Sequence, residues 1–256
     1  MKKLIIIFTF LAFCSANAEE ITVVTEEWPP FNYTENGKVI GVVTEVVEAV
    51  LDKAGIKAKI RAVPWARAYK MASEDENTLI YTIFRMPERE SLFHWIKLDG
   101  LSTRMYLYSP GSRSDIVIKS LEDAKKYRIG VTRKTSTHVF LHSKGFQEDI
   151  NLFPVNSEVQ NAMKADPSVN RIDLTTGDKL SLAMWLKKSD LPPDYWKEEI
   201  FLFKEDFYMA FAKKTSDEVV ERVRDAFQQV KAEGKLDAFI EKYMRTYQQR
   251  TPAPKK

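Results

Sequence analysis

Two arginines that follow an apolar segment are the residues of this chain best suited to bind an anion. The run Leu79–Phe84, rich in β-branched and aromatic residues, is typical of a buried strand. Pro87 would end that strand, because proline suits the first turn of a helix. Arg85 and Arg89 would therefore lie where a strand leaves a sheet, a frequent place for ligand contacts in α/β proteins. The planar guanidinium of Arg89 can grip a carboxylate through charge and two hydrogen bonds. The alternative is that Arg89 pairs with a neighbouring glutamate on a solvated turn.

The N-terminus predicts export. A basic start and the apolar run Leu4–Phe13 precede Ala-Asn-Ala at 16–18, which fits a signal peptidase site. Residues 1–18 are therefore expected to be a signal peptide, and the protein is expected in the periplasm. The run is too short to span a bilayer, so we expect no membrane anchor after cleavage. Cys14 leaves lipidation open, although lipoprotein signals carry a small residue where Phe13 stands.

Composition argues against a nucleic-acid partner. The 256 residues include 39 Lys and Arg against 36 Asp and Glu, and loss of two lysines with the signal peptide lowers the net charge from +3 to +1. Nucleic-acid binding needs a concentrated basic face instead. Cleavage also removes the single cysteine, so no internal disulfide is expected. His138 and His142 have metal-ligand spacing but no nearby Glu or Cys, so we expect no metal. We also expect no cofactor, and we predict a monomer.

Strand-like and helix-like segments alternate along the chain, as in α/β proteins with parallel sheets. A first βαβαβ series ends at the run Leu79–Phe84, and a second begins after a crossover near 104–109. Short strands are expected at 200–203 and 208–212, before two helices that divide at Gly234. We therefore predict an α/β fold of two lobes, each a mostly parallel sheet flanked by helices, with the ligand cleft between them. Lobe 1 is expected to comprise 19–106 and 207–247, lobe 2 to comprise 107–206, and 248–256 to form a flexible tail.

Six segments, in order and across nearly the whole chain after residue 18, match one known family. They are EEWPPFNY at 26–33, GVVTEVVEAVLDKAGI at 41–56, RMPERE at 85–90, SLEDAKKYRIGVTRKTST at 120–137, NRIDLTTGD at 170–178, and the closing FYMAFAKK…AEGKLDAFIEKYM. The chain resembles the extracellular (periplasmic) solute-binding proteins of ABC importers, in the branch that binds polar amino acids. The resemblance implies their two-lobed type II fold.

The resemblance also implies roles for particular residues. Trp28 matches the aromatic residue that covers the ligand, and Arg89 matches the arginine that clamps its α-carboxylate. Thr135 and Ser136 match a helix N-terminus whose hydroxyls and amides meet the same carboxylate. Asp178 matches the acid that holds the α-ammonium. Helix capping is the alternative for Thr135 and Asp178.

One position departs from the family pattern. Phe84 stands where relatives carry a small hydroxyl residue, so Thr82 or Tyr81 would have to substitute. Arg85 adds a cation near Arg89, and several arginines against one matched acid suggest an acidic amino acid or a dicarboxylate as ligand. Weaker candidates for ligand contact are Phe31, Trp65, Arg67 and Arg133.

The resemblance implies a substrate-binding protein that captures a small amino-acid-like or carboxylate solute and delivers it to an ABC permease, without catalysis. Two alternatives stay open. One is a periplasmic enzyme on the same scaffold, similar to cyclohexadienyl dehydratases, for which Glu26 or Glu27 would supply a general acid. The other is a ligand-sensing partner of a membrane signalling protein.

Overall fold

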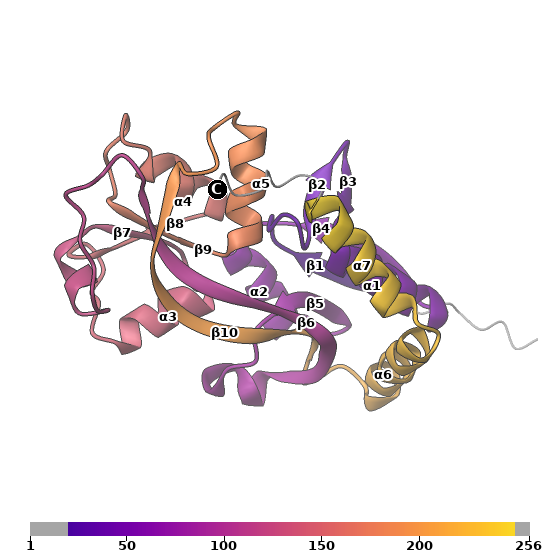
Figure 1. Cartoon of the computed structure of the whole chain (residues 1–256). Coiled ribbons are helices and arrows are strands. Elements are labelled where there is room, and N and C mark those ends of the chain that lie inside the picture. Colours follow the sequence, from indigo (N-terminus) through magenta and orange to yellow (C-terminus); the bar gives the residue numbers. More distant parts are fainter. Residues whose placement is uncertain (1–19, 249–256) are drawn as a thin grey trace, which may run out of the picture.

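The computed structural model of the chain describes residues 20–248 (Figure 1). The predicted signal peptide, 1–18, lies outside the described residues, and so do residues 249–256 of the predicted tail. Among residues 20–248, no helix is long and apolar enough to cross a bilayer.

The described chain alternates strands and helices in the following order. They are β1 (Glu20–Thr25), β2 (Tyr33–Glu35), β3 (Lys38–Ile40), α1 (Val42–Lys53), β4 (Lys57–Ala62), α2 (Trp65–Glu74), β5 (Thr78–Ile83), the 3₁₀ helix η1 (Pro87–Leu92), β6 (Phe93–Pro110), the 3₁₀ helix η2 (Asp123–Lys126), β7 (Ile129–Thr132), α3 (Ser136–Ser143), β8 (Leu152–Val155), α4 (Glu158–Ala165), β9 (Leu174–Gly177), α5 (Lys179–Lys188), β10 (Trp196–Ala212), α6 (Asp217–Ala232) and α7 (Lys235–Gln248).

Eight of these strands form one sheet, in the order β4-β1-β5-β10-β6-β9-β7-β8. The strands β4, β1 and β5 are parallel at one end, and β9, β7 and β8 are parallel at the other. Between them, β6 and β10 pair antiparallel along most of their length. Helices flank each parallel group (Figure 1). The predicted α/β fold class is therefore confirmed.

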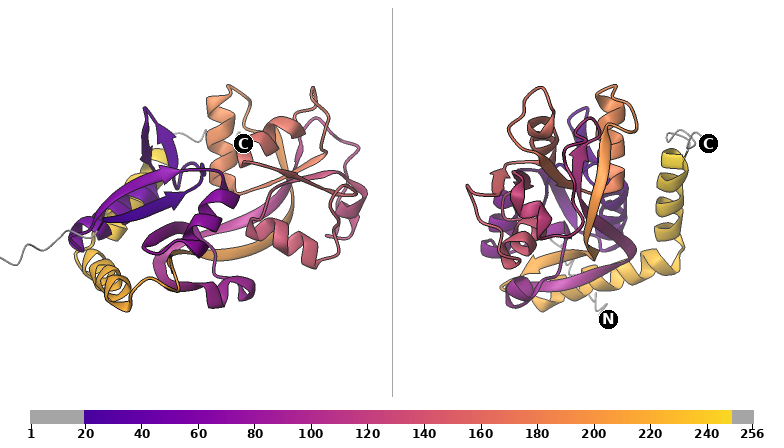
Figure 2. Two further views of the ribbon diagram at one scale, coloured as in Figure 1. Left: turned by 180° about the vertical axis from the view of Figure 1, so that it is seen from behind. Right: turned by 60° about the vertical axis from the view of Figure 1, so that its left-hand side comes forward.

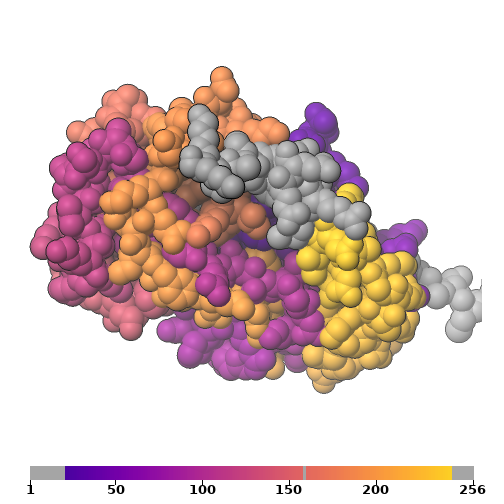
Figure 3. Space-filling model, viewed as in Figure 1, coloured from indigo at the N-terminus to yellow at the C-terminus, as the bar shows by residue number. Residues whose placement is uncertain are grey.

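The parallel groups define two halves of the molecule, which lie on opposite sides in Figure 1. We call the first half β1–β5 with α1, α2, α6 and α7, and the second half β7–β9 with α3–α5. The long strands β6 and β10 run from one half into the other. After β10 the chain returns to the first half, where α6 and α7 pack on α1 and cover the outer side, yellow in Figures 2 and 3.

Every residue of the strand β5 is buried, because helices cover both of its faces. Leu79 and Tyr81 pack into the same buried cluster as the valines of α1, whereas Ile80 packs with Trp65 and Ala68 of α2. Successive side chains of a strand point to opposite faces of the sheet. A strand buried on both faces therefore reads as a continuous apolar run, as the sequence predicted for this segment.

The helix α1 buries one apolar face whose residues recur at helical spacing. Val42, Val46, Val47, Val50 and Leu51 are all buried against the first half of the sheet. β-branched residues are mediocre helix formers, so the burial of this apolar stripe, and not intrinsic propensity, holds the segment helical.

The long strands β6 and β10 correct two expectations. The sequence predicted separate strands at 200–203 and 208–212, but β10 is continuous over Trp196–Ala212. Its pairing with β6 shifts register three times, and each shift breaks the alternation of apolar and polar residues by which strands are recognised. β6 itself, Phe93–Pro110, extends well before the predicted crossover near 104–109.

Candidate functional site

The strand β5 ends in a bulge that turns Thr82 toward a cavity. Tyr81 pairs with Met209 and Ile83 with Tyr208, so Thr82 between them is the extra residue of β5. Its backbone adopts φ 59°, which is unusual for a β-branched residue. The side chain is buried, lines the cavity, and its hydroxyl has no hydrogen-bond partner within the described chain. Strained backbone and an unpaired buried hydroxyl at one position are typical of a binding site.

Arg89 is buried in η1 at the same cavity and is 4% exposed. Its guanidinium carbon lies 5.2 Å from the ring centroid of Trp65 and 5.1 Å from that of Tyr69. Nη1 donates to the carbonyl of Phe84 at 3.3 Å, and Nη2 donates to the carbonyl of Lys134 at 3.1 Å. Burial lowers the pKa of Arg89, and the aromatic Tyr69 and the charge of Glu26 oppose that shift. An arginine keeps its charge through such a shift, so the cavity contains a desolvated cation.

Arg85 takes a different position from Arg89. Its side chain is 44% exposed and forms a bidentate pair with Glu90, with Nε 2.7 Å from one carboxylate oxygen and Nη2 2.5 Å from the other. Arg85 does not line the cavity. The ion pair with a neighbouring glutamate, which was the alternative for Arg89, is thus formed by Arg85.

The second half contributes the N-terminus of α3. Thr135 caps this helix: its Oγ1 accepts from the amide of His138 at 3.3 Å and donates to the carbonyl of Thr132 at 2.8 Å. Thr135, Ser136 and the following Thr137 line the cavity, with Ser136 and Thr137 buried. The first amides of a helix and its dipole favour an anion at this end. Both α3 and Arg89 therefore favour an anion in the cavity, from opposite halves.

Lys134 connects the halves through its main chain. Its carbonyl accepts from Trp65 Nε1 at 2.8 Å as well as from Arg89, both in the first half. Its amide donates to His138 Nδ1 at 3.0 Å, and His138 Nε2 lies 3.0 Å from a carboxylate oxygen of Glu148. This arrangement holds the turn before α3, in which Lys134 has φ 61°. The two halves therefore touch across the site.

The cavity between the halves contains about 360 Å³ of empty space, part of it open to solvent. Six of the predicted ligand contacts line it: Trp28, Thr82, Arg89, Thr135, Ser136 and the weaker candidate Trp65. Arg67 and Arg133 are exposed and, like Arg85, do not line the cavity, and Phe31 is buried without reaching it.

Trp28 is held by aromatic rings around it. Its ring packs edge-on against Phe31 at 5.3 Å, Phe84 at 5.7 Å and Phe207 at 5.5 Å between centroids. Phe31 thus supports Trp28 from behind. The ring of Trp28 lines the cavity while its indole N–H donates to Asp178 Oδ2 at 2.8 Å.

Asp178 caps α5 and lies behind the cavity wall. Its Oδ1 accepts from the amides of Leu180 and Ser181, both at 3.0 Å, and its Oδ2 accepts from the Ser181 hydroxyl and the Trp28 indole. Burial raises the pKa of Asp178, and these hydrogen bonds oppose the rise. Asp178 therefore caps α5, and it is not among the residues that line the cavity.

Four cavity residues were not among the predicted ligand contacts: Glu26, Phe84, Met105 and Thr137. The sequence offered a signal for three of them. Glu26 and Thr137 lie within the matched segments, and Phe84 was noted as a departure from the pattern. Met105 had none, because its place depends on the pairing of β6 with β10. Within the described chain, no group of three His, Cys, Asp or Glu side chains could hold a metal ion.

We expect the change Thr82→Val to stabilise the unliganded protein by about 1 kcal/mol, since it removes a buried hydroxyl without a partner while conserving shape. Ligand affinity should fall because the same hydroxyl faces the cavity. Denaturant unfolding and ligand titration measure the two effects.

Thr78→Val is the matched control, because Thr78 is buried in the same strand but its hydroxyl donates to the carbonyl of Glu76 at 3.4 Å. This variant should lose stability and keep ligand affinity. A Thr82→Val variant that is less stable and binds normally would contradict the assignment.

Comparison with known sequences defines the class of protein. The sequence pattern of the bacterial extracellular solute-binding proteins, family 3, matches residues 21–246, so the chain belongs to this family. The resemblance seen in the six motifs is thus confirmed, and membership implies a periplasmic or extracellular location.

Particular relatives agree with this assignment. The chain is 24% identical over 220 residues to the probable amino-acid-binding protein YxeM of Bacillus subtilis (strain 168), covering 84% of this chain and 79% of the relative. Among solved structures, a histidine kinase sensor domain superimposes with a TM-score of 0.77 at 12% identity, over 88% of this chain and 95% of the other. ArtJ of Geobacillus stearothermophilus, which binds arginine, lysine and histidine, superimposes with a TM-score of 0.75 at 19% identity, over 88% and 94% of the two chains. At such identities these superpositions establish the fold alone.

Proposed function

We propose that this protein captures a small amino-acid-like or carboxylate solute between its two halves and delivers it to an ABC permease in the membrane. One observation carries the proposal: the buried cation of Arg89 and the N-terminus of α3 face the same cavity from opposite halves. A carboxylate bound between them would gain charge-assisted hydrogen bonds from both sides. The family membership and the amino-acid-binding relative support this class of ligand.

The proposed cycle uses the contacts between the halves. Ligand enters while the halves are apart and meets Arg89 and Trp28, and closure then adds Thr135 and Ser136. Because the ligand makes contacts in the closed form that it lacks in the open form, it shifts the equilibrium toward closure. The hinge lies in β6 and β10, the strands that join the halves. We propose the lobe boundaries 19–106 with 207–247 and 107–206, and a periplasmic monomer after loss of residues 1–18.

A thermal-shift screen tests the proposal. The panel contains the common amino acids, polyamines and dicarboxylates, each with the purified protein. A compound at a hundred times its dissociation constant should stabilise the protein by about 2.7 kcal/mol, which is readily seen as a shift in melting temperature. We expect at least one carboxylate compound to give such a shift. A panel that gives none would contradict the proposal.

The position of Glu26 favours one further candidate, an enzyme on the same scaffold. Glu26 is buried and lines the cavity, where a carboxyl group can act as a general acid. Incubation with prephenate or arogenate, followed by absorbance of an aromatic product, tests a dehydratase activity. Product formation that is lost in Glu26→Gln would favour the enzyme over the binding protein.

A further inference from the structure

We propose that the carboxylate that holds the ligand's ammonium group in this protein is Glu26 of the first half, and that Asp178 instead positions Trp28 and caps α5. The inference rests on the proposed function and names the class of ligand that the site takes, a zwitterion for which the first half supplies a charged partner to each end. The motif resemblance assigned the ammonium to Asp178.

The hydrogen-bonding capacity of Asp178 is already used. A carboxylate has about four acceptor positions, and the four of Asp178 receive two amides of α5, the hydroxyl of Ser181 and the indole of Trp28. Three of these donors belong to α5 itself, so they stay with Asp178 whether or not ligand is bound. An ammonium could replace only the indole of Trp28.

Trp28 is not readily displaced from Asp178. Trp28 is 7% exposed, and its ring is held edge-on by Phe31, Phe84 and Phe207. Phe84 and Phe207 are themselves stacked, with 5.7 Å between centroids and 5° between planes. Moving the indole would break this packing and leave a buried N–H to find a new acceptor. Trp28 therefore lies between the cavity and Asp178.

Glu26 lines the cavity, whereas Asp178 does not. Among the described residues that line the cavity, Glu26 is the only carboxylate and Arg89 the only cation. Both are buried, and the negative charge of Glu26 favours the charged form of Arg89. Two buried opposite charges on one small cavity match the two charges of an amino acid, with the carboxylate toward Arg89 and α3 and the ammonium toward Glu26.

The test compares each amino acid with the same acid lacking the ammonium group, for example L-glutamine with 4-carbamoylbutanoic acid. The pair is chosen from the amino acid with the largest thermal shift, and dissociation constants are measured by calorimetry. We expect wild type to prefer the amino acid by about thirtyfold or more, the effect of one buried charge-assisted contact. Glu26→Gln should abolish that preference and leave the affinity for the ammonium-free acid within about threefold.

Asp178→Asn is the matched comparison, since asparagine caps helices about as well as aspartate. Loss of the Trp28 contact should change the affinity for both compounds together, so the preference for the amino acid should persist. A preference that is lost in Asp178→Asn and kept in Glu26→Gln would overturn the assignment. Glu26→Asp, which keeps the charge on a shorter side chain, should show an intermediate preference and serves if Glu26→Gln does not fold.

The outcome also separates this inference from the proposed function. If carboxylates stabilise the wild-type protein but none is bound more tightly with an ammonium group than without one, the role of Glu26 is overturned and capture of a carboxylate stands. If no compound of either kind binds, the proposed function fails, and the inference fails with it.

Discussion

The variant Arg89→Ala is expected to lose the ligand-induced thermal shift, with a fall in ligand affinity of about 30-fold or more. Truncation of one partner in a buried, hydrogen-bonded charge pair costs about 2–5 kcal/mol, and Arg89 is the one cation among the described residues that line the cavity. The ligand's carboxylate would be left desolvated without its counter-charge. Isothermal calorimetry with the compound identified by the screen measures the loss.

The conservative change Arg89→Lys should not restore binding. Arginine presents a planar fork of donors, whereas lysine presents a single compact ammonium. The guanidinium of Arg89 also lies against the rings of Trp65 and Tyr69 and donates to carbonyls from both halves, a combination that one ammonium group cannot reproduce.

The matched control for Arg89 is Arg85→Ala. Arg85 lies four residues away and carries the same charge, but it is exposed and paired with Glu90. Its removal should leave ligand affinity unchanged, since an exposed ion pair contributes little. If Arg85→Ala lost binding and Arg89→Ala kept it, the anion site would lie at the surface and the cavity assignment would be wrong.

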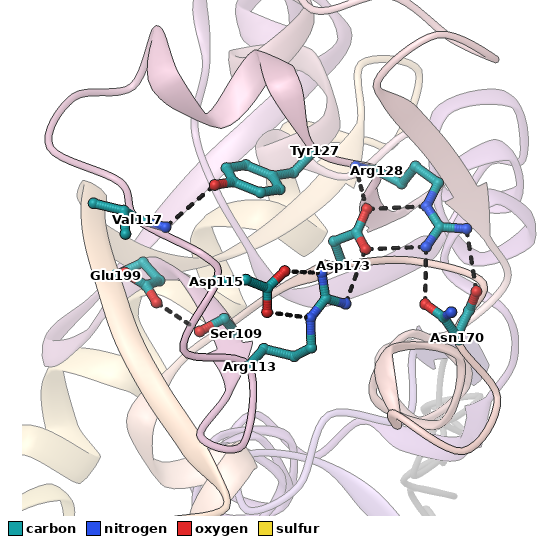
Figure 4. A network of polar contacts seen from close by, with 9 residues as sticks. All are labelled: Ser109, Arg113, Asp115, Val117, Tyr127, Arg128, Asn170, Asp173 and Glu199. Carbon is teal, nitrogen blue, oxygen red and sulfur yellow. Dashed lines mark hydrogen bonds and ion pairs between the residues drawn. The ribbon is translucent and has the colours of Figure 1, made fainter.

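The second large effect is expected in the second half, at Asp173. Asp173 is 8% exposed, and its carboxylate accepts four hydrogen bonds: from the amide, Nε and Nη2 of Arg128 at 2.9–3.0 Å and from Nη1 of Arg113 at 3.2 Å (Figure 4). Asp173 and Arg128 directly precede the paired strands β9 and β7. Arg113 belongs to the connection after β6, so one carboxylate ties three segments of the chain together.

We expect Asp173→Ala to lower the free energy of unfolding by about 3 kcal/mol, because the change leaves two partly buried arginines without their shared partner. Urea denaturation at neutral pH measures the loss. Asp115→Ala is the matched control, since Asp115 also pairs with Arg113 but its side chain is 64% exposed. The control should lose far less stability, and an equal loss in both variants would contradict the role given to Asp173.

The stabilisation by Asp173 should also depend on pH. Burial alone would raise the pKa of Asp173, but hydrogen bonds from Arg128 and Arg113 and the charge of Arg128 outweigh burial and hold it at about 2. A depressed pKa stabilises the folded state fully above the unfolded value of about 3.9. That contribution is lost as the pH falls from about 4 towards 2. The difference in stability between wild type and Asp173→Ala should therefore shrink across this interval and stay constant above pH 5.

Local features of the fold could be predicted where the residues of a single segment are enough to determine its structure. The burial of β5 on both faces, the valine stripe of α1, and the division of the last helices at Gly234 all follow from periodicity and from backbone preferences. The strands β6 and β10 could not be predicted in this way. They are held by each other over a long antiparallel pairing with register shifts, and a single segment does not reveal such a partner.

The amino-acid sequence by itself determined the family, the alternation of strands and helices, and which side chains could meet an anion: Arg89 and the hydroxyls of Thr135 and Ser136. Those properties reside in residue types and in spacings along the chain. Only the tertiary structure distinguished residues of the same charge. It placed Arg89 at the cavity and Arg85 at the surface, and it placed Glu26 at the cavity and Asp178 behind Trp28 as a helix cap. The reason is that burial and hydrogen-bond saturation depend on what the other half of the molecule brings to each side chain.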